Sequence, residues 1–228
     1  MAEKGVVESV KDSIVASIKG TGEIVNAVID TVRGTLVNTI KGTGTVGAAL
    51  TGTVSDILRG AIQGTTQVGA DVGYAARGAV LGVIRGAKEV GIGAMDAITA
   101  SARAVVKSTA EVGGDVGAAA KGAVLGVVDG AKEIGIGTMD AISASAGAVV
   151  KGASEVGGDV ATAAKNAVEG AITAAQEVGL SAEEAATAAA TGALKAAGGI
   201  SSTAVEEVRK VVTGTISGVK VVVKEPFK

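Results

Sequence analysis

The sequence contains no cysteine, histidine or tryptophan, and only one phenylalanine, one tyrosine and one proline among 228 residues. Without cysteine there is no disulfide framework and no thiol nucleophile. Without histidine the chain lacks the usual neutral-pH proton carrier and the commonest metal ligand. So few aromatic residues argue against an ordinary globular core. The absence of cysteine fits a reducing compartment, and we expect a cytoplasmic protein.

Strong net charge and long apolar runs are also missing. The formal charge is −2 and the isoelectric point is near 5.3, which gives little electrostatic support for nucleic-acid binding. The longest uncharged run lies between Lys41 and Asp56 and is shorter than the stretch of about 20 apolar residues that crosses a bilayer. The N-terminal segment lacks the continuous apolar core of a secretory signal. We therefore expect neither nucleic-acid binding nor a transmembrane span.

What the chain does have is internal repetition. Residues 78–121 and 122–165 differ at 11 of 44 positions, so 33 positions are identical, with no insertion. Such regularity is typical of repeat proteins. We predict one continuous array, made of diverged repeats in 1–77, two near-identical repeats in 78–165, a third, Ala-rich copy in 166–199 and a C-terminal capping segment in 200–228.

The long repeat contains a shorter period of eleven residues, which is one quarter of its length. On this period 41 of the 44 charged residues occupy five of the eleven positions. Such a unit makes three helical turns at about 3.67 residues each, which gathers those positions into one polar stripe. The pattern predicts an all-α protein of long amphipathic helices in an extended bundle or polymer. The charged positions keep the same 11-residue spacing through Gly113–Gly114 and Gly157–Gly158, so continuous helices are favoured over helices separated by loops. A β-solenoid is the alternative fold.

Small residues recur on the apolar side of this pattern. Glycines stand at every fourth position in several rows, and an apolar residue followed by glycine returns twice in each long repeat. Rows of glycine let another helix backbone approach closely. We predict that one set of residues forms a helix-packing or lipid-facing surface: Gly82, Gly86, Val90, Gly91, Val112, Gly113, Gly126, Gly130, Ile134, Gly135, Val156 and Gly157.

No motif points to catalysis, a metal or a cofactor. Residues 42–47 match the GxGxxG phosphate-binding pattern, but the required acid about 20 residues later is missing. Acidic pairs such as Glu111 with Asp115 recur in each repeat and lie on the polar stripe, as a solvated face would. We therefore expect no enzyme activity, no cofactor and no metal.

The segments at residues 86–91 and 130–135, Gly-Ala-Lys-Glu-(Val/Ile)-Gly, resemble the Lys-Glu-Gly-Val-type units of synucleins, and the Val-Thr-Gly composition resembles perilipin repeats. Group 3 late-embryogenesis-abundant proteins and exchangeable apolipoproteins belong to the same 11- or 22-residue repeat class. The resemblance implies long amphipathic helices, with lipid-surface binding or desiccation protection as function.

The residues themselves favour a non-catalytic structural protein that self-associates through Gly/Ala/Val helix faces into a filament or extended assembly. In that hypothesis the partner is the chain itself. The alternative is a coat of a lipid surface such as a droplet or vesicle. A stress or desiccation protectant is the third hypothesis.

Overall fold

The computed structural model describes residues 5–21, 23–43 and 49–223. Within these ranges the chain is almost entirely helical, in agreement with the predicted all-α class and not with a β-solenoid. The elements in order are α1 (Val6–Thr21), α2 (Ile24–Thr43), α3 (Ala49–Gln67), α4 (Val72–Glu89), α5 (Ala94–Glu111), α6 (Val116–Ile134), α7 (Thr138–Glu155), α8 (Val160–Val178), α9 (Ala182–Gly198), α10 (Ser202–Val212), β1 (Gly214–Ile216) and β2 (Val219–Val221).

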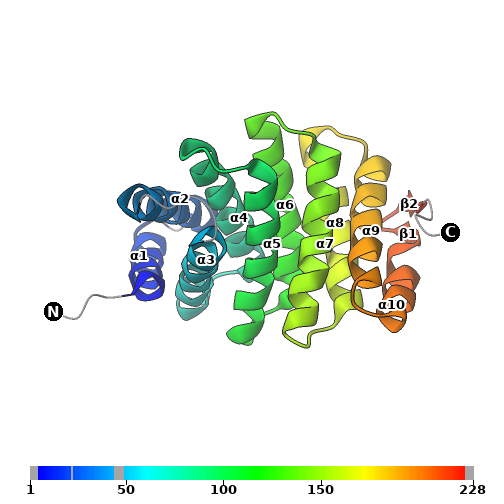
Figure 1. Cartoon of the computed structure of the whole chain (residues 1–228), viewed down its shortest axis with the longest axis horizontal. Coiled ribbons are helices and arrows are strands. Elements are labelled where there is room, and N and C mark those ends of the chain that lie inside the picture. Colours follow the sequence, from blue (N-terminus) through cyan, green and yellow to red (C-terminus); the bar gives the residue numbers. More distant parts are fainter. Residues whose placement is uncertain (1–4, 22, 44–48, 224–228) are drawn as a thin grey trace.

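The helices stack in two layers. Each helix packs most extensively against the helix two places along the chain, as α4 does against α2 and α6, and less against its direct neighbours. The odd-numbered helices α5, α7 and α9 therefore form one layer, and α4, α6 and α8 form the layer behind it (Figure 1). The chain is a compact helical repeat, and one long repeat unit is a pair of helices.

The prediction of continuous helices is wrong, because a turn follows every helix from α3 to α8. One glycine in each of these turns adopts positive φ: Gly69, Gly91, Gly113, Gly135, Gly157 and Gly179, with φ between 66° and 77°. This left-handed conformation ends a helix and carries little steric cost only for glycine. These glycines recur at half the long repeat, which is two of the short periods, so the charge phase continues although the helix does not.

Polar side chains begin α4, α6, α8 and α9, whereas α5 and α7 begin at a glycine without a side-chain cap. Asp115 accepts a hydrogen bond from the backbone N–H of Ala118 at 2.9 Å, and Asp159 accepts from Ala161 and Thr162. Ser181 accepts from the backbone N–H of Glu184 at 3.2 Å and is the N-cap of α9. Each cap satisfies a backbone donor that the first helical turn leaves without a partner.

Glycine inside the helices allows close stacking within a layer. A Cβ atom at Gly78 would lie 2.7 Å from the carbonyl oxygen of Val25, and one at Gly82 would lie 2.8 Å from that of Ile29. At Gly126 it would collide with the backbone of Arg77. These glycines therefore bring backbone against backbone between α2, α4 and α6, and Val and Ala fill the buried space around them.

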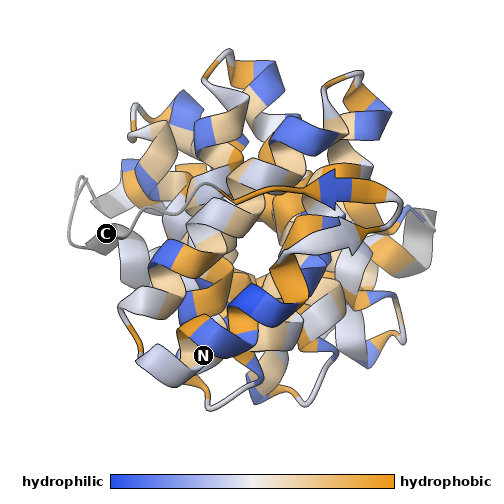
Figure 2. Ribbon diagram, turned by 90° about the vertical axis from the view of Figure 1, so that its right-hand side faces the viewer, coloured by the Kyte–Doolittle hydropathy of each residue, from blue (hydrophilic) through white to orange (hydrophobic). Residues whose placement is uncertain are grey.

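Both ends of the stack carry polar residues. On α2 the positions equivalent to the buried Gly82 and Val83 of α4 are Asn38, which is exposed, and Thr39. At the other end α10 exposes charged side chains, and the antiparallel hairpin β1–β2 lies across the stack (Figure 2). Polar outer surfaces of this kind are typical of terminal capping repeats.

In the part of the chain that is described, none of the helices is both long enough and apolar enough to span a bilayer.

Candidate functional site: a groove over the odd-numbered helices

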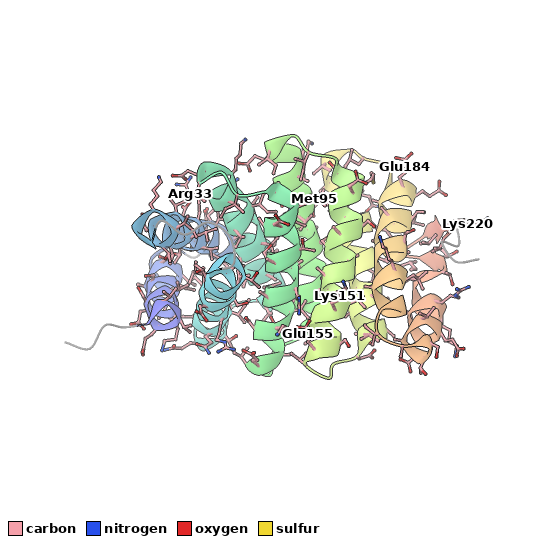
Figure 3. The ribbon with its side chains drawn as sticks, in the orientation of Figure 1. Arg33, Met95, Lys151, Glu155, Glu184 and Lys220 are labelled. Atoms are coloured by element: carbon pink, nitrogen blue, oxygen red, sulfur yellow. The ribbon has the colours of Figure 1, made fainter. Side chains whose placement is uncertain are left out.

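A groove of about 980 Å³ crosses the layer of odd-numbered helices. It runs over α3, α5, α7 and α9 and includes the turn between α4 and α5. Figure 3 shows Lys151 and Glu155 on this layer, which faces the viewer. The groove is therefore built by successive repeats rather than by one of them.

Equivalent positions of successive repeats line the groove in four rows, because stacked helices place positions one long repeat apart side by side. One row carries hydroxyl groups, the second and third carry small side chains, and the fourth carries lysine. In order these rows are Ser55, Thr99 and Ser143; Ala100 and Ala144; Ala104, Ala148 and Gly192; and Lys107, Lys151 and Lys195. The floor is thus nearly flat, and one side is cationic.

The acids of the groove lie on its other side. Asp96 and Asp140 stand in the first turns of α5 and α7, where the helix dipole stabilises a negative charge. Each precedes the lysine of the same helix by one short period, which separates the two along the helix axis by about 16 Å. Screening over about 8–10 Å in physiological salt makes the acidic and basic sides largely independent.

Ion pairs connect one repeat to the next within this layer. Arg59 of α3 contacts Glu111 of α5 at 2.6 Å, and both Arg103 and Lys107 of α5 contact Glu155 of α7. Desolvation raises the pKa of the Glu155 carboxyl, but the hydrogen bonds from Arg103 and Lys107 outweigh it and leave the pKa below its ordinary value. These ion pairs connect neighbouring helices of the layer rather than positions of one helix.

The series of ion pairs stops at α7. The position equivalent to Glu155 in the next repeat is Gly199, so the acid that would meet Lys151 is missing. Lys151 and Lys195 are both exposed, and neither makes an ion pair with any residue that the structure describes. The groove therefore has two uncompensated positive charges at its α7–α9 end.

The opposite layer has more of its charges paired. Arg77 of α4 donates to Asp129 of α6 at 2.7 Å and to Glu177 of α8 at 2.8 Å. The hydrogen bond to Asp129 is the main cause that raises the pKa of the Arg77 guanidinium above its already high ordinary value. Arg85 likewise contacts Glu133 at 2.8 Å. This layer uses its charges chiefly to connect helices α4, α6 and α8.

The small and apolar residues predicted to form one packing surface fall into separate places. Gly82, Gly86, Gly126 and Gly130 lie against neighbouring helices, where a Cβ atom would be too close to another side chain or backbone. For the set at the helix ends the prediction is wrong. Gly91, Gly113, Gly135 and Gly157 sit in turns with open space around them, because their role is to supply positive φ. The residues before them are partly buried: Val90, Val112, Ile134 and Val156.

The acidic pairs also separate. Glu111 is the last residue of α5, whereas Asp115 is the N-cap of α6, so the two do not share a helix face. The GxGxxG pattern at 42–47 lies mostly outside the described residues. In the described ranges no group of three Asp or Glu residues could hold a metal ion.

Sequence reasoning missed the groove, although its lysine row was visible as Lys107, Lys151 and Lys195, each one long repeat after the last. The groove could not be predicted because the turn that ends each half-repeat was not recognised. These turns let helices one long repeat apart stack side by side, and only this stacking brings the three lysines together. Chemically, the groove can hold an extended chain against a flat floor and offer ammonium groups to its anionic side chains.

Comparison with protein families and with curated proteins finds no match. Among solved structures the chain is similar to the crystal structure of the de novo designed helical repeat protein DHR7, with 18% identity and a TM-score of 0.43. That likeness covers 83% of this chain and 95% of the designed one.

Proposed function

We propose that this protein is a non-catalytic binding scaffold that holds an extended polypeptide segment in the groove over α3, α5, α7 and α9. The observation that carries the proposal is the repetition of hydroxyl, small and lysine positions across successive odd-numbered helices. A partner that repeats along its length fits a site that repeats along the stack. Extended binding surfaces across several repeats are a usual product of helical arrays.

The small-residue rows support a polypeptide occupant. Ala100, Ala144 and Gly192 leave the floor low, so a backbone can lie close to the helices. The Thr99 hydroxyl donates to the backbone carbonyl oxygen of Met95, so it can accept a hydrogen bond from a passing main chain. The Ser143 hydroxyl in the same row can donate or accept. Recurrence of the same residue types argues for binding rather than for catalysis, which needs one distinct constellation.

Self-association into a filament and coating of a lipid surface receive less support. Both require a free apolar face, whereas the Val, Ala and Gly residues of this chain pack mainly between its own helices. The polar residues at the two ends of the stack also disfavour end-to-end growth. These two functions are therefore kept as alternative outcomes of the tests.

The proposal can be tested with a phage-displayed library of random dodecapeptides. Peptides selected on the wild-type protein are resynthesised, and their affinities are measured by fluorescence anisotropy. We expect selected peptides to lose at least ten-fold in affinity for the double variant A100Q/A144Q, because the longer side chains fill the floor of the groove. The equivalent position on α3 is the exposed Asp56, so a polar side chain is compatible with the fold.

A118Q on α6 is the matched control. The positions equivalent to Ala118 hold Tyr74 and Thr162, so a larger side chain is accepted there as well. This variant should bind the peptides as the wild type does. Equal affinity of wild type and A100Q/A144Q, or failure to select any peptide, would contradict the proposed function.

A further inference from the structure

The interruption in the ion-pair series identifies the charge that a partner must bring. Glu111 pairs with Arg59, and Glu155 pairs with both Arg103 and Lys107, each from the next helix of the layer. At α9 the equivalent residue is Gly199, which has no side chain to offer. The position beside Lys151 that is filled by a carboxylate earlier in the array is therefore open to a carboxylate from another molecule.

The helix spacing sets the spacing of those carboxylates. Packed helices lie about 8–10 Å apart, so Lys107, Lys151 and Lys195 follow one another at about that interval. A polyproline-II segment has three residues per turn and rises about 3.1 Å per residue, so every third residue points the same way, about 9 Å farther along. One side chain of such a segment is thus matched to each of Lys151 and Lys195, the two lysines of the row that have no ion pair with a described residue.

The acids of the groove do not oppose this arrangement. Asp96 and Asp140 lie about 16 Å from the lysine row along the helix axis. Glu155, the nearest acid to Lys107, is already paired with Lys107 and Arg103. The uncompensated charge is greatest between Lys151 and Lys195, over the floor that Gly147, Gly192 and Ala196 form.

We propose that the α7–α9 part of the groove binds an acidic polypeptide segment in extended conformation, with a carboxylate at every third residue on Lys151 and Lys195. This inference rests on the proposed function and specifies its partner. A nucleic acid also carries regularly spaced anions, but the overall negative charge of the protein favours a sparsely charged polypeptide over a polyanion.

The test uses two fluorescein-labelled dodecapeptides of identical composition. One has glutamate at its third, sixth and ninth positions, and the other has three adjacent glutamates. We expect the first to bind the wild-type protein several-fold more tightly in fluorescence anisotropy at about 0.1 M NaCl, and binding to weaken at about 0.5 M as the charges are screened. The variants K151Q and K195Q should each weaken it about two- to five-fold, the range for an exposed ion pair.

Two matched pairs control for overall charge and for folding. K88Q removes one exposed lysine of the opposite layer and should leave affinity unchanged. G199E restores the acid of the ion-pair series and should weaken binding as strongly as K151Q, whereas G199Q should not. Gly199 has φ −82°, so both side chains are sterically acceptable.

The inference is overturned if both peptides bind equally, if K88Q weakens binding as much as K151Q, or if a single-stranded oligonucleotide displaces the peptide at lower concentration than the peptide binds. It also fails if neither peptide binds the wild type. In each of these cases the selected peptides and A100Q/A144Q still decide the proposed function independently.

Discussion

Glycine has two structural roles in this chain, and its place in the helix-turn unit decides which. Gly82 and Gly126 lie inside helices and allow the backbones of neighbouring helices to touch. Gly113 and Gly157 lie in turns, where they supply positive φ and where an added Cβ atom would meet no other atom within 4 Å. A larger side chain is therefore harmful at both kinds of position, by overpacking at the first and by backbone strain at the second.

Replacement of Gly82 by alanine should destabilise the protein although alanine is the better helix former. The new methyl group would lie 2.8 Å from the carbonyl oxygen of Ile29 and 3.0 Å from the Cβ of Val32. Overpacking costs about 1–3 kcal/mol and the gain in helix propensity is about 0.8–1 kcal/mol, so the net loss should be about 1 kcal/mol. Urea unfolding followed by circular dichroism measures it.

The control is G34A, since Gly34 is the equivalent of Gly78 on α2 and a Cβ atom there meets no other atom within 4 Å. Alanine should stabilise the protein by about 0.5–1 kcal/mol at this position. If G34A destabilised the protein as G82A does, close approach of neighbouring helices would not be the reason for glycine in α4.

At the scale of the element, the N-cap residue Asp159 ties the stability of α8 to pH. The carboxylate of Asp159 accepts a hydrogen bond from the hydroxyl of Thr162 at 2.6 Å and from two backbone N–H groups. The hydroxyl hydrogen bond is the largest cause that lowers the pKa of Asp159, and the backbone hydrogen bonds lower it further. The charged cap is thus the form that stabilises α8.

Because the folded-state pKa of Asp159 lies below the unfolded value of about 3.9, its stabilising effect is present above that pH and is lost as pH falls through the folded-state pKa. D159A should cost about 1 kcal/mol at pH 7, and less as the pH is lowered below about 4. D159N, which keeps an acceptor oxygen, should cost less than D159A at pH 7. Urea unfolding of the wild type, D159A and D159N at pH 7 and pH 3 measures these differences. A loss of unfolding free energy in D159A that is the same at both pH values would contradict the proposed role of the charged cap.

Helical class and the N-cap at Ser181 could be predicted from local sequence, because propensity and capping act within a few residues. The spacing of the charged residues could not show where the helices end. Each helix with its turn is two short periods long, so the charged positions recur in the same register after every turn. Gly91 and Gly135 looked like packing residues for the same reason. The groove depends on contacts between positions one long repeat apart, and no local pattern specifies which helices stack.

At the scale of the whole molecule, the helices of the array bury one another's apolar faces. The glycine and valine faces that an isolated helix would expose are covered by the next helix of the same chain, and polar residues cover the ends. The groove over the odd-numbered helices remains as a surface that repeats without being covered by the described residues. The apolar faces therefore serve folding, and the groove is the surface for which we propose binding.

The measurement that tests this most directly is small-angle X-ray scattering with static light scattering on the purified protein without lipid. We predict a monomer of 21.8 kDa, with a radius of gyration near the value of about 17 Å for a compact chain of this length and far below about 52 Å for the unfolded chain. Large or growing particles would contradict the account in favour of self-assembly. A monomeric coil that becomes helical only when vesicles are added would contradict it in favour of a lipid coat.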